Sequence, residues 1–385
     1  MKRKIVGIFI CMILTLTAFS LSASSYEILE NTIYVDDDAT PEWYDSIHVH
    51  TIQEGIDVAI NSDAVFVYSG VYKENIIINK SLVIEGEDKK STIIDGQRNG
   101  EYVIRVNANQ VEIGEFTIQN GSRGNYKSGI KMGNSDYCSI TDCIFVDNGW
   151  AAEIRDSGHC TFNNNLVYDN DGGGIHLASA PYTTIKGCKF SGNAKKGIMT
   201  WGGEHFVIES NEFIGCGLEM YNGPPSENVI QNTIVENTVN GKPLIYMENE
   251  IGKIIKGAGQ VILFYCKGIL VKNLDLSNTA IGVSVFGSCL IRIVANTINN
   301  NADGISVDKS FGIGVVSNNI SDNWYTGIGV YNSGLCQISS NKVCGNYYGL
   351  FLQGFLFNLP YFNTIKDNEK FNILINSPFL PLIQL

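Results

Sequence analysis

The feature that most constrains this sequence is a repeat of 22 or 23 residues that is marked by asparagine. Asn148, Asn170 and Asn193 are separated by 22 and 23 residues, and a second series with the same spacing comprises Asn301, Asn323, Asn346 and Asn368. Five residues before these positions stands another small or polar side chain: Cys143, Asn165, Cys188, Asn296, Asn318, Asn341 or Asn363. A fixed period of this length predicts an array of stacked structural units.

Within each unit, short runs of alternating apolar and polar residues have the periodicity of β-strands. Gly and Asn separate these runs, and both residues tolerate the left-handed backbone conformation of a tight corner. Each unit is therefore expected to be one coil of three short strands, with equivalent residues ~4.8 Å apart on successive coils. Stacked asparagines can then bridge the coils through their side-chain amides. The predicted fold is all-β: a single-stranded right-handed parallel β-helix solenoid with a short N-terminal helical cap.

The two ends of the chain depart from the repeat. A basic start and an apolar run from Ile5 to about Phe19 predict a secretory signal peptide. Thr51 and Glu54 form a capping-box pattern, so we expect a short helix that covers the open end of the first coil. The predicted organisation is a signal peptide (1–24), an N-terminal cap region (25–62), the β-helix (63–370, with an irregular insertion at about 222–260) and a C-terminal tail or cap (371–385).

Composition excludes several classes of protein. Apolar residues make up 44% of the chain and charged residues 17%, so the core is ample and disorder is not expected. The net charge is −12 and the sequence has no cluster of Lys and Arg, which argues against nucleic acid as a partner. After cleavage of the signal peptide, no stretch is long enough to span a bilayer. We therefore expect a secreted or cell-surface protein, with the oligomeric state left open.

Nine cysteines remain after residue 24, and none forms the Cys-x-x-Cys pair that is typical of zinc sites. Cys138 and Cys160 both lie ten residues before a repeat asparagine, so they should stack on adjacent coils. Stacked side chains keep their Cβ atoms near the coil spacing, whereas a disulfide requires about 3.8 Å. We expect two thiols, with a disulfide as the alternative.

Three segments resemble a known superfamily. Gly70–Asn75, Lys80–Gly86 and Thr92–Gly96 are similar to the opening coils of the pectin-lyase-like superfamily, and Asn237–Tyr246 and the later repeats resemble NosD-type β-helix proteins. The resemblance extends over roughly Ile33 to Asn368. It implies the fold, together with a choice of activities: polysaccharide lyase, hydrolase, uronate epimerase or, as for NosD, assembly of a copper site. The catalytic motifs of these enzymes are mostly missing; for example, Gly158-His159-Cys160 is the nearest match to the Gly-His-Gly of polygalacturonases.

Aligning the coils places polar side chains in two neighbouring outward-facing columns. The first contains Lys131, Glu153, His176, Met199 and Glu219, and the second Gly133, Arg155, Ala178, Trp201 and Tyr221. Candidate catalytic residues are Glu153, His176, Glu204 and Glu219, because paired carboxylates and imidazoles support acid–base chemistry. Candidate substrate-binding residues are Lys131, Arg155, Trp201 and Tyr221. Farther along, the columns continue as Ser284, Ser306, Gly329 and Phe351 and as Phe286, Asp308, Tyr331 and Gln353, so we expect the chemistry to fade towards the C-terminus.

Metal binding has two weaker candidates. His159, His176 and His205 fall on successive repeats, so two of them could share an ion such as copper. Asp36-Asp37-Asp38 could bind calcium, although it lacks the spacing of a calcium-binding loop. The outward-facing columns also fit a solvated outer sheet without a site; if they form a site, the residues favour binding over catalysis. The predicted function is that of an exported β-helix protein that binds polysaccharide or another cell-envelope component; the alternatives are a lyase, hydrolase or epimerase, or NosD-like assembly of a copper site.

Overall fold

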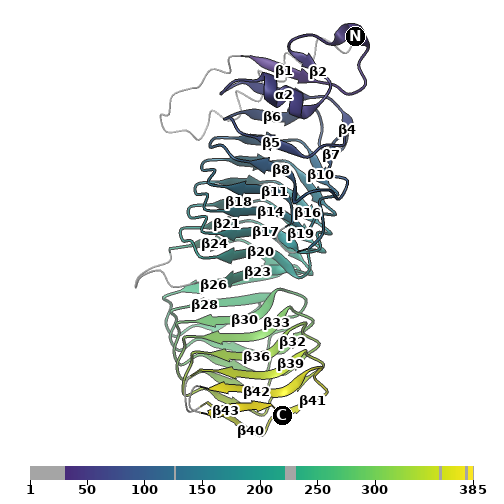
Figure 1. Cartoon of the computed structure of the whole chain (residues 1–385). Coiled ribbons are helices and arrows are strands. Elements are labelled where there is room, and N and C mark those ends of the chain that lie inside the picture. The colour runs from purple at the N-terminus through teal and green to yellow at the C-terminus, as the bar shows by residue number, and fades with distance from the viewer. Residues whose placement is uncertain (1–30, 125–126, 222–230, 355–357, 378–379, 385) are drawn as a thin grey trace.

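The structure is a computed structural model that describes residues 31–384 apart from 125–126, 222–230, 355–357 and 378–379. Within this part of the chain, the strands are accompanied by a single α-helix, α2 (Ile52–Val58), and one 3-10 helix, η2 (Pro41–Trp43). The strands stack in coils along one long axis (Figure 1), and nearly all of them pair in parallel. The predicted parallel β-helix is confirmed. The predicted signal peptide lies outside the described residues.

Three sheets form the N-terminal half of the solenoid. Sheet 1 contains, in order, β2 (His48–Val49), β1 (Thr32–Val35), β3 (Ala64–Val67), β6 (Val83–Gly86), β9 (Glu112–Gly114), β12 (Ser139–Thr141), β15 (Thr161–Asn163), β18 (Thr184–Lys186), β21 (Val207–Glu209) and β24 (Thr233–Val235). Sheet 2 starts with β4 (Gly70–Tyr72), β7 (Thr92–Asp95), β10 (Thr117–Gln119), β13 (Ile144–Val146), β16 (Leu166–Tyr168), β19 (Lys189–Ser191), β22 (Glu212–Ile214) and β25 (Thr238–Val239). Sheet 3 contains β5 (Ile76–Ile78), β8 (Tyr102–Val106), β11 (Ser128–Gly133), β14 (Trp150–Arg155), β17 (Gly173–Ala178), β20 (Lys196–Trp201) and β23 (Gly217–Tyr221).

The C-terminal half is also built from three sheets. Sheet 2 continues through β26 (Lys242–Glu248), β28 (Gln260–Phe264), β30 (Ile281–Phe286), β33 (Asp303–Asp308), β36 (Thr326–Tyr331), β39 (Tyr348–Gln353), β42 (Phe371–Ser377) and β43 (Leu380–Gln384). Sheet 4 contains β27 (Ile254–Ile255), β29 (Leu270–Lys272), β31 (Arg292–Val294), β34 (Gly314–Val316), β37 (Gln337–Ser339) and β40 (Leu359–Tyr361). Sheet 5 contains β32 (Thr297–Asn299), β35 (Asn319–Ser321), β38 (Lys342–Cys344) and β41 (Thr364–Lys366).

Helix α2 begins as the capping-box pattern predicts. The Thr51 side chain accepts a hydrogen bond from the backbone N–H of Glu54, and the Glu54 carboxylate accepts one from the N–H of Thr51. The helix buries Ile52 and Ile56 and packs against β1 and β3, the first long pair of sheet 1. Gly55 permits the close approach, because a Cβ there would lie 2.9 Å from a methyl group of Val35.

The asparagine ladders are present, and they are buried. In the N-terminal half, the Nδ2 of Asn148 donates to Oδ1 of Asn170 at 3.1 Å, and Asn170 donates to Asn193 at 3.0 Å. In the C-terminal half, Asn318 receives a bond from Asn296 and donates to Asn341, both at 3.0 Å. Each side chain also bonds backbone groups of neighbouring coils, so the ladders satisfy polar groups that a water-free corner would otherwise leave unpaired.

The two halves meet at β28, which is buried along its whole length. Ile262 and Phe264 belong to the hydrophobic core of the N-terminal half, whereas Val261 and Leu263 belong to that of the C-terminal half. The Gln260 side chain bonds both the N–H and the C=O of Leu218 and so takes the place of a strand partner for β23. Sheet 3 therefore ends at β23, and the long strands of the C-terminal half belong to sheet 2.

Part of the segment 222–260, where an irregular insertion was expected, forms regular strands of the solenoid. Residues 222–230 lie outside the described part, but β24 pairs in parallel with β21, and β25 pairs with β22. β26 then turns back antiparallel to β25 at the sequence Asn240–Gly241, where Gly241 has a φ of 74°. At the far end, β42 extends sheet 2 in parallel with β39, and β43 folds back antiparallel on β42.

The cysteine positions give a test of the register. Cys138 and Cys160 precede β12 and β15, which pair residue for residue. Each thiol lies 3.4 Å from a different backbone carbonyl, Ala108 O and Ser135 O, and the two thiols also contact each other. We expect both to remain thiols, so alkylation in denaturant without reductant, followed by mass spectrometry, should label each one; denaturant is needed because both are buried. A linked Cys138–Cys160 peptide would contradict this expectation.

The same experiment tests the coil order through a second pair of cysteines. Asn165 lies between Cys143 and Cys188: its Oδ1 accepts from the N–H of Cys143 at 2.9 Å, and its Nδ2 lies 3.9 Å from the sulfur of Cys188. A linked Cys143–Cys188 peptide would therefore be incompatible with the structure.

Candidate functional site

The predicted outer columns are in register on sheet 3. Lys131 pairs with Glu153, Glu153 with His176, His176 with Met199, and Met199 with Glu219; in the second column, Arg155 pairs with Ala178, Ala178 with Trp201, and Trp201 with Tyr221. The parallel strands place these side chains on one face at the coil spacing. The sequence therefore located this face correctly, while its function is still a prediction.

Glu153 is the centre of a charged cluster on this face. It is 1% exposed, and its Oε1 accepts a hydrogen bond from Nε of Arg155 at 2.6 Å. Lys131 lies 3.9 Å from the other oxygen, and Nδ1 of His176 lies 4.0 Å from Oε1. Burial lowers the pKa of His176 against the opposing effect of Glu153, so the imidazole is neutral at pH 7. The cluster brings together three of the predicted site residues around Glu153.

Glu219 has a separate set of partners. It is 1% exposed, accepts a hydrogen bond from the Tyr221 hydroxyl at 2.6 Å, and lies 3.2 Å from Nζ of Lys196. Burial, followed by the charge of Glu219, raises the pKa of Tyr221 well above its usual range. Glu204 lies at the corner after β20, 3.9 Å from Nε2 of His205. The two candidate carboxylates therefore have separate partners: Glu219 contacts Lys196 and Tyr221, and Glu204 lies beside His205.

Two of the three candidate metal-binding histidines belong to a stack of aromatic rings at the corner between sheets 3 and 1. Tyr137, His159, Tyr182 and His205 stack with centroid distances of 4.6–4.7 Å and interplanar angles of 1–7°. The Tyr182 ring separates the two histidines, and His176 lies on β17 in the interior of sheet 3. The expectation that two of them share an ion is therefore wrong for this geometry.

The acidic run near the N-terminus is the one group of three possible metal ligands that the described residues bring together. One oxygen from each of Asp36, Asp37 and Asp38 lies within 4.8 Å of the others, and Asp37 and Asp38 are exposed. Burial raises the pKa of Asp36, and its acidic neighbours add to this effect. Calcium at this position is still only a prediction.

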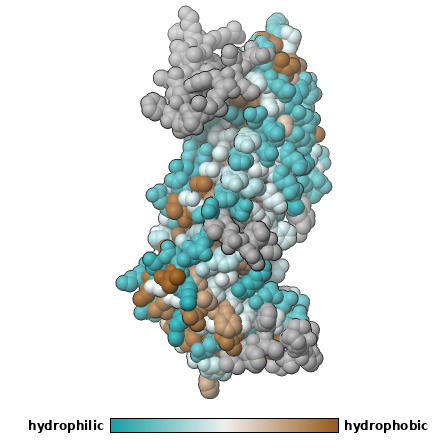
Figure 2. Space-filling view, turned by 90° about the vertical axis from the view of Figure 1, so that its left-hand side faces the viewer, coloured by the Kyte–Doolittle hydropathy of each residue, from teal (hydrophilic) through white to brown (hydrophobic). Residues whose placement is uncertain are grey.

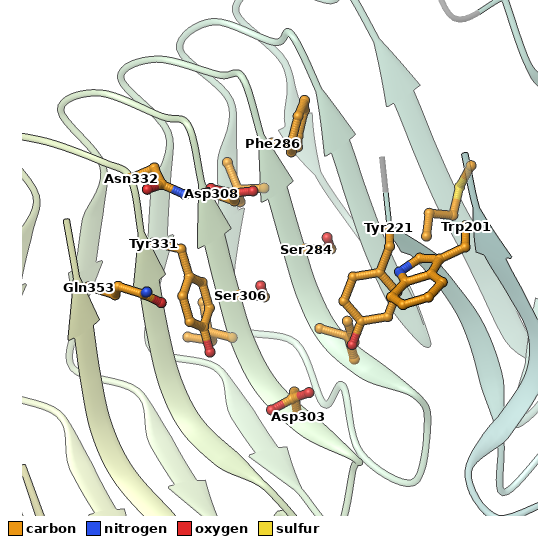
Figure 3. A pocket seen from close by; sticks show the side chains of 14 residues that line it. Trp201, Tyr221, Ser284, Phe286, Asp303, Ser306, Asp308, Tyr331, Asn332 and Gln353 are labelled. Atoms are coloured by element: carbon orange, nitrogen blue, oxygen red, sulfur yellow. Dashed lines mark hydrogen bonds between the residues drawn. The ribbon is translucent and has the colours of Figure 1, made fainter. Parts of the chain in front are cut away.

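The side chains of Trp201 and Tyr221 line a groove where sheet 3 ends and the long strands of sheet 2 begin. The groove has a volume of about 380 Å³. Figure 3 shows Trp201 and Tyr221 together on one side, Tyr331 and Gln353 on the other, and Ser284 and Ser306 between them. The full lining is Trp201, Met220, Tyr221, Ile281, Ser284, Val285, Phe286, Asp303, Ile305, Ser306, Asp308, Tyr331, Asn332 and Gln353.

The groove is hollow because one column of sheet 2 carries small residues. Ser284, Ser306 and Gly329 are in register, and Phe351 follows them. The Tyr331 ring folds across Gly329, where a Cβ would lie 2.6 Å from the ring. The Phe351 ring lies 5.4 Å from that of Tyr331. The absence of large side chains at three successive positions thus opens the groove, and aromatic rings bound it.

The carboxyl group of Asp303 is perturbed by its position in the groove. Burial, followed by the charge of Glu219, raises its pKa to about 6, and hydrogen bonding by Thr326, whose backbone N lies 3.0 Å from Oδ1, opposes the rise. Burial, and then Asp303, raise the pKa of the nearby Tyr331 to about 12. Asp303 is therefore a group that can hold a proton close to neutral pH.

The C-terminal columns, where the chemistry was expected to fade, line the groove in the structure. Phe286, Asp308, Tyr331 and Gln353, which the sequence placed in the continuing column, all line the groove, and Tyr331 and Gln353 lie opposite Trp201 and Tyr221. Asp303 opens β33 and was not among the predicted residues. A signal was present in the sequence, because a run of small residues beside a column of polar and aromatic ones predicts a depression on a sheet.

Stacked coils with this register define a class of protein, the right-handed parallel β-helix. Residues 128–253 match the family model described as right handed beta helix region, and residues 243–377 match that of NosD, described as periplasmic copper-binding protein. Each match covers about a third of the chain, so the chain is similar to right-handed β-helix proteins over the first segment and to NosD over the second.

Individual relatives are more distant. A cell surface glycoprotein of Methanothermus fervidus is 36% identical over 104 residues, which are 26% of this chain; the match spans 16% of that protein's length. The A-module of a mannuronan C-5 epimerase from Azotobacter vinelandii has 14% identity and a TM-score of 0.40, and covers 85% of this chain and 94% of its own. PfbA, a surface adhesin of Streptococcus pneumoniae, has 13% identity and a TM-score of 0.39. The match covers 84% of this chain and 89% of PfbA. At these identities, the likeness to the solved structures concerns the fold alone.

The histidines do not fit a copper site of the kind that the NosD description would imply. All five of them lie outside residues 243–377, the segment that matches NosD. His159 and His205 stack on opposite faces of the Tyr182 ring, which separates them. Copper ligation by these histidines therefore has no support from the geometry.

Proposed function

We propose that this chain is an exported, cell-surface β-helix protein that binds a polysaccharide in the groove between sheet 3 and the long strands of sheet 2. The predicted signal peptide and the similarity of one segment to a cell surface glycoprotein support export. In the described residues, no helix has the length and hydrophobicity needed to cross a bilayer. The observation that carries the binding proposal is the composition of the groove.

The groove combines the two kinds of group that a sugar ring requires. Trp201 and Tyr221 present ring surface on one side and Tyr331 on the other, while Phe286 lies at the edge of the groove between them. Aromatic rings offer apolar faces that match the C–H faces of a sugar, and their polar tips stay in water. Asn332, Gln353 and the two serines offer hydrogen-bond donors and acceptors for the hydroxyl groups. Binding sites of this type typically pair an apolar lining with a few polar groups that fix orientation.

The first test is a matched pair of tryptophan variants. Trp201 lines the groove and is 53% exposed, whereas Trp324 lies at the corner before β36, is 52% exposed and is not part of the lining. With purified protein and a panel of soluble polysaccharides, we expect Trp201→Ala to weaken binding by about tenfold, which corresponds to ~1.4 kcal/mol. Trp324→Ala should bind as the unaltered chain does. Equal affinity of all three proteins would refute the groove as the binding site.

Catalysis is the second candidate, and one observation favours it. Asp303 combines a raised pKa with a place in the groove near the charge of Glu219, which is the situation of a general acid. Incubation of the same polysaccharides with the protein, followed by assays of reducing ends and of unsaturated products, separates the two functions. Release of either product would make the chain a hydrolase or lyase rather than a binding protein.

A further inference from the structure

The sign of the charge in the groove bears on which glycan can occupy it. Of the described residues that line it, Asp303 and Asp308 are acidic, and none is Lys, Arg or His. Glu219 adds a third carboxylate next to Tyr221, and it accepts a hydrogen bond from the Tyr221 hydroxyl at 2.6 Å. The chain as a whole carries a net charge of −12. A ligand that enters the groove therefore meets a negative potential.

The nearest cations are already engaged. Nζ of Lys196 lies 3.2 Å from Oε2 of Glu219, so its charge is offset by a buried carboxylate. Lys309 is exposed, and its Nζ lies over the Phe286 ring, 5.2 Å from the centroid. An exposed ammonium group is screened by salt. Neither cation offers the paired donors that an Arg would present to the carboxylate of a uronic acid.

The hydrogen-bonding groups of Asp303 and Asp308 also disfavour an acidic ligand. Asp308 lines the groove and accepts a hydrogen bond from Nδ2 of Asn332 at 3.1 Å, so its carboxylate has further acceptor capacity for a ligand. Asp303 accepts from the N–H of Thr326. Carboxylates are acceptors when ionised, so they recognise hydroxyl or ammonium hydrogens and repel a second carboxylate.

We infer that the glycan bound in this groove carries no acidic groups and donates hydroxyl or ammonium hydrogens to Asp303 and Asp308. This inference rests on the proposed function, and it narrows the substrate class. It separates this chain from the uronate polymers that the pectin-lyase-like resemblance implies. An uncharged glycan and an amine-bearing one share the donor chemistry, and they differ in how salt affects their binding.

The test measures the affinity of the full chain without its signal peptide for three groups of oligosaccharides at pH 7.5. Cellohexaose, laminarihexaose and mannohexaose are uncharged, chitosan hexamer carries amines, and hexamers of galacturonate and mannuronate are acidic. We expect at least one uncharged or amine-bearing ligand to bind ten times more tightly than either acidic one. An amine-bearing ligand should lose affinity on raising NaCl from 50 to 500 mM, whereas an uncharged one should not.

A charge-matched pair of variants assigns the effect to the groove. Asp308→Asn should weaken the preferred ligand at least fivefold, whereas Asp322→Asn, which removes an exposed carboxylate outside the lining, should not. Tightest binding of an acidic hexamer would overturn the inference while leaving the proposed function in place. Binding of no glycan at all would remove the proposed function, and the inference with it. Should Asp308→Asn not fold, the ranking of ligands by the unaltered chain still decides the question.

Discussion

Replacement of Asn318 by alanine is expected to destabilise the C-terminal coils by about 3–5 kcal/mol. The Asn318 Oδ1 accepts bonds from both the backbone N–H and the side-chain amide of Asn296, at 2.9 and 3.0 Å. Its Nδ2 donates to the carbonyl of Ile293 at 2.9 Å and to Asn341. Asn318 is 2% exposed, so alanine leaves several of these groups buried without a partner, and each such group costs about 1–3 kcal/mol.

The neighbouring residue provides the control for this variant. Asn319 is exposed at the start of β35, so Asn319→Ala should change stability by about 0.5 kcal/mol or less. Thermal unfolding should show the difference, and hydrogen exchange should place it, because a solenoid transmits a local defect mainly to adjacent coils. Equal midpoints for the two variants would show that the buried ladder contributes little to stability.

The second large effect concerns the pH dependence of stability. Glu85 lies on β6 with its carboxylate over Gly114 of the next coil, where a Cβ would come within 2.3 Å of Oε2. Burial, followed by the charges of Glu115, Asp142 and Glu112, raises its pKa to about 7. Glu85→Gln should therefore stabilise the protein at pH 8 by about 2–3 kcal/mol and leave its stability at pH 4 nearly unchanged.

The direction follows from the order in which the two states lose the proton. The folded state keeps the Glu85 proton up to about pH 7, whereas the unfolded state loses it near the ordinary value of 4.5. The favourable contribution is complete below pH 4.5 and is lost as pH rises to 7. Denaturant melts of both proteins at several pH values should show the curves separating over this interval. Glu87→Gln, an exposed neighbour, is the control, and a gap of the same size for both variants would contradict the explanation.

Much of the fold and part of the site follow from local pattern. The spacing of Asn148 and Asn170 predicted both the coil length and the ladder, because a side chain that repeats every coil can only stack on itself. The same periodicity placed Glu153, His176 and Trp201 on one outer face. These predictions depend on alternation along a strand, which the sequence displays directly.

Other features depended on contacts between distant segments. The Gln260 side chain that completes the edge of β23 bonds Leu218, which lies 42 positions away in the sequence. The core is also divided at β28, where neighbouring residues of one strand face different halves. The groove arises from this junction, because it sets Trp201 and Tyr221 against Tyr331 and Gln353. The sequence by itself determined the coil, its register and its outward residues, since these repeat locally. Only the tertiary structure decided that Asp303 and Asp308 face the aromatic residues of another sheet. Sheet 3 ends and the long strands of sheet 2 begin at a junction between distant segments, and no periodic pattern in the sequence encodes such a junction.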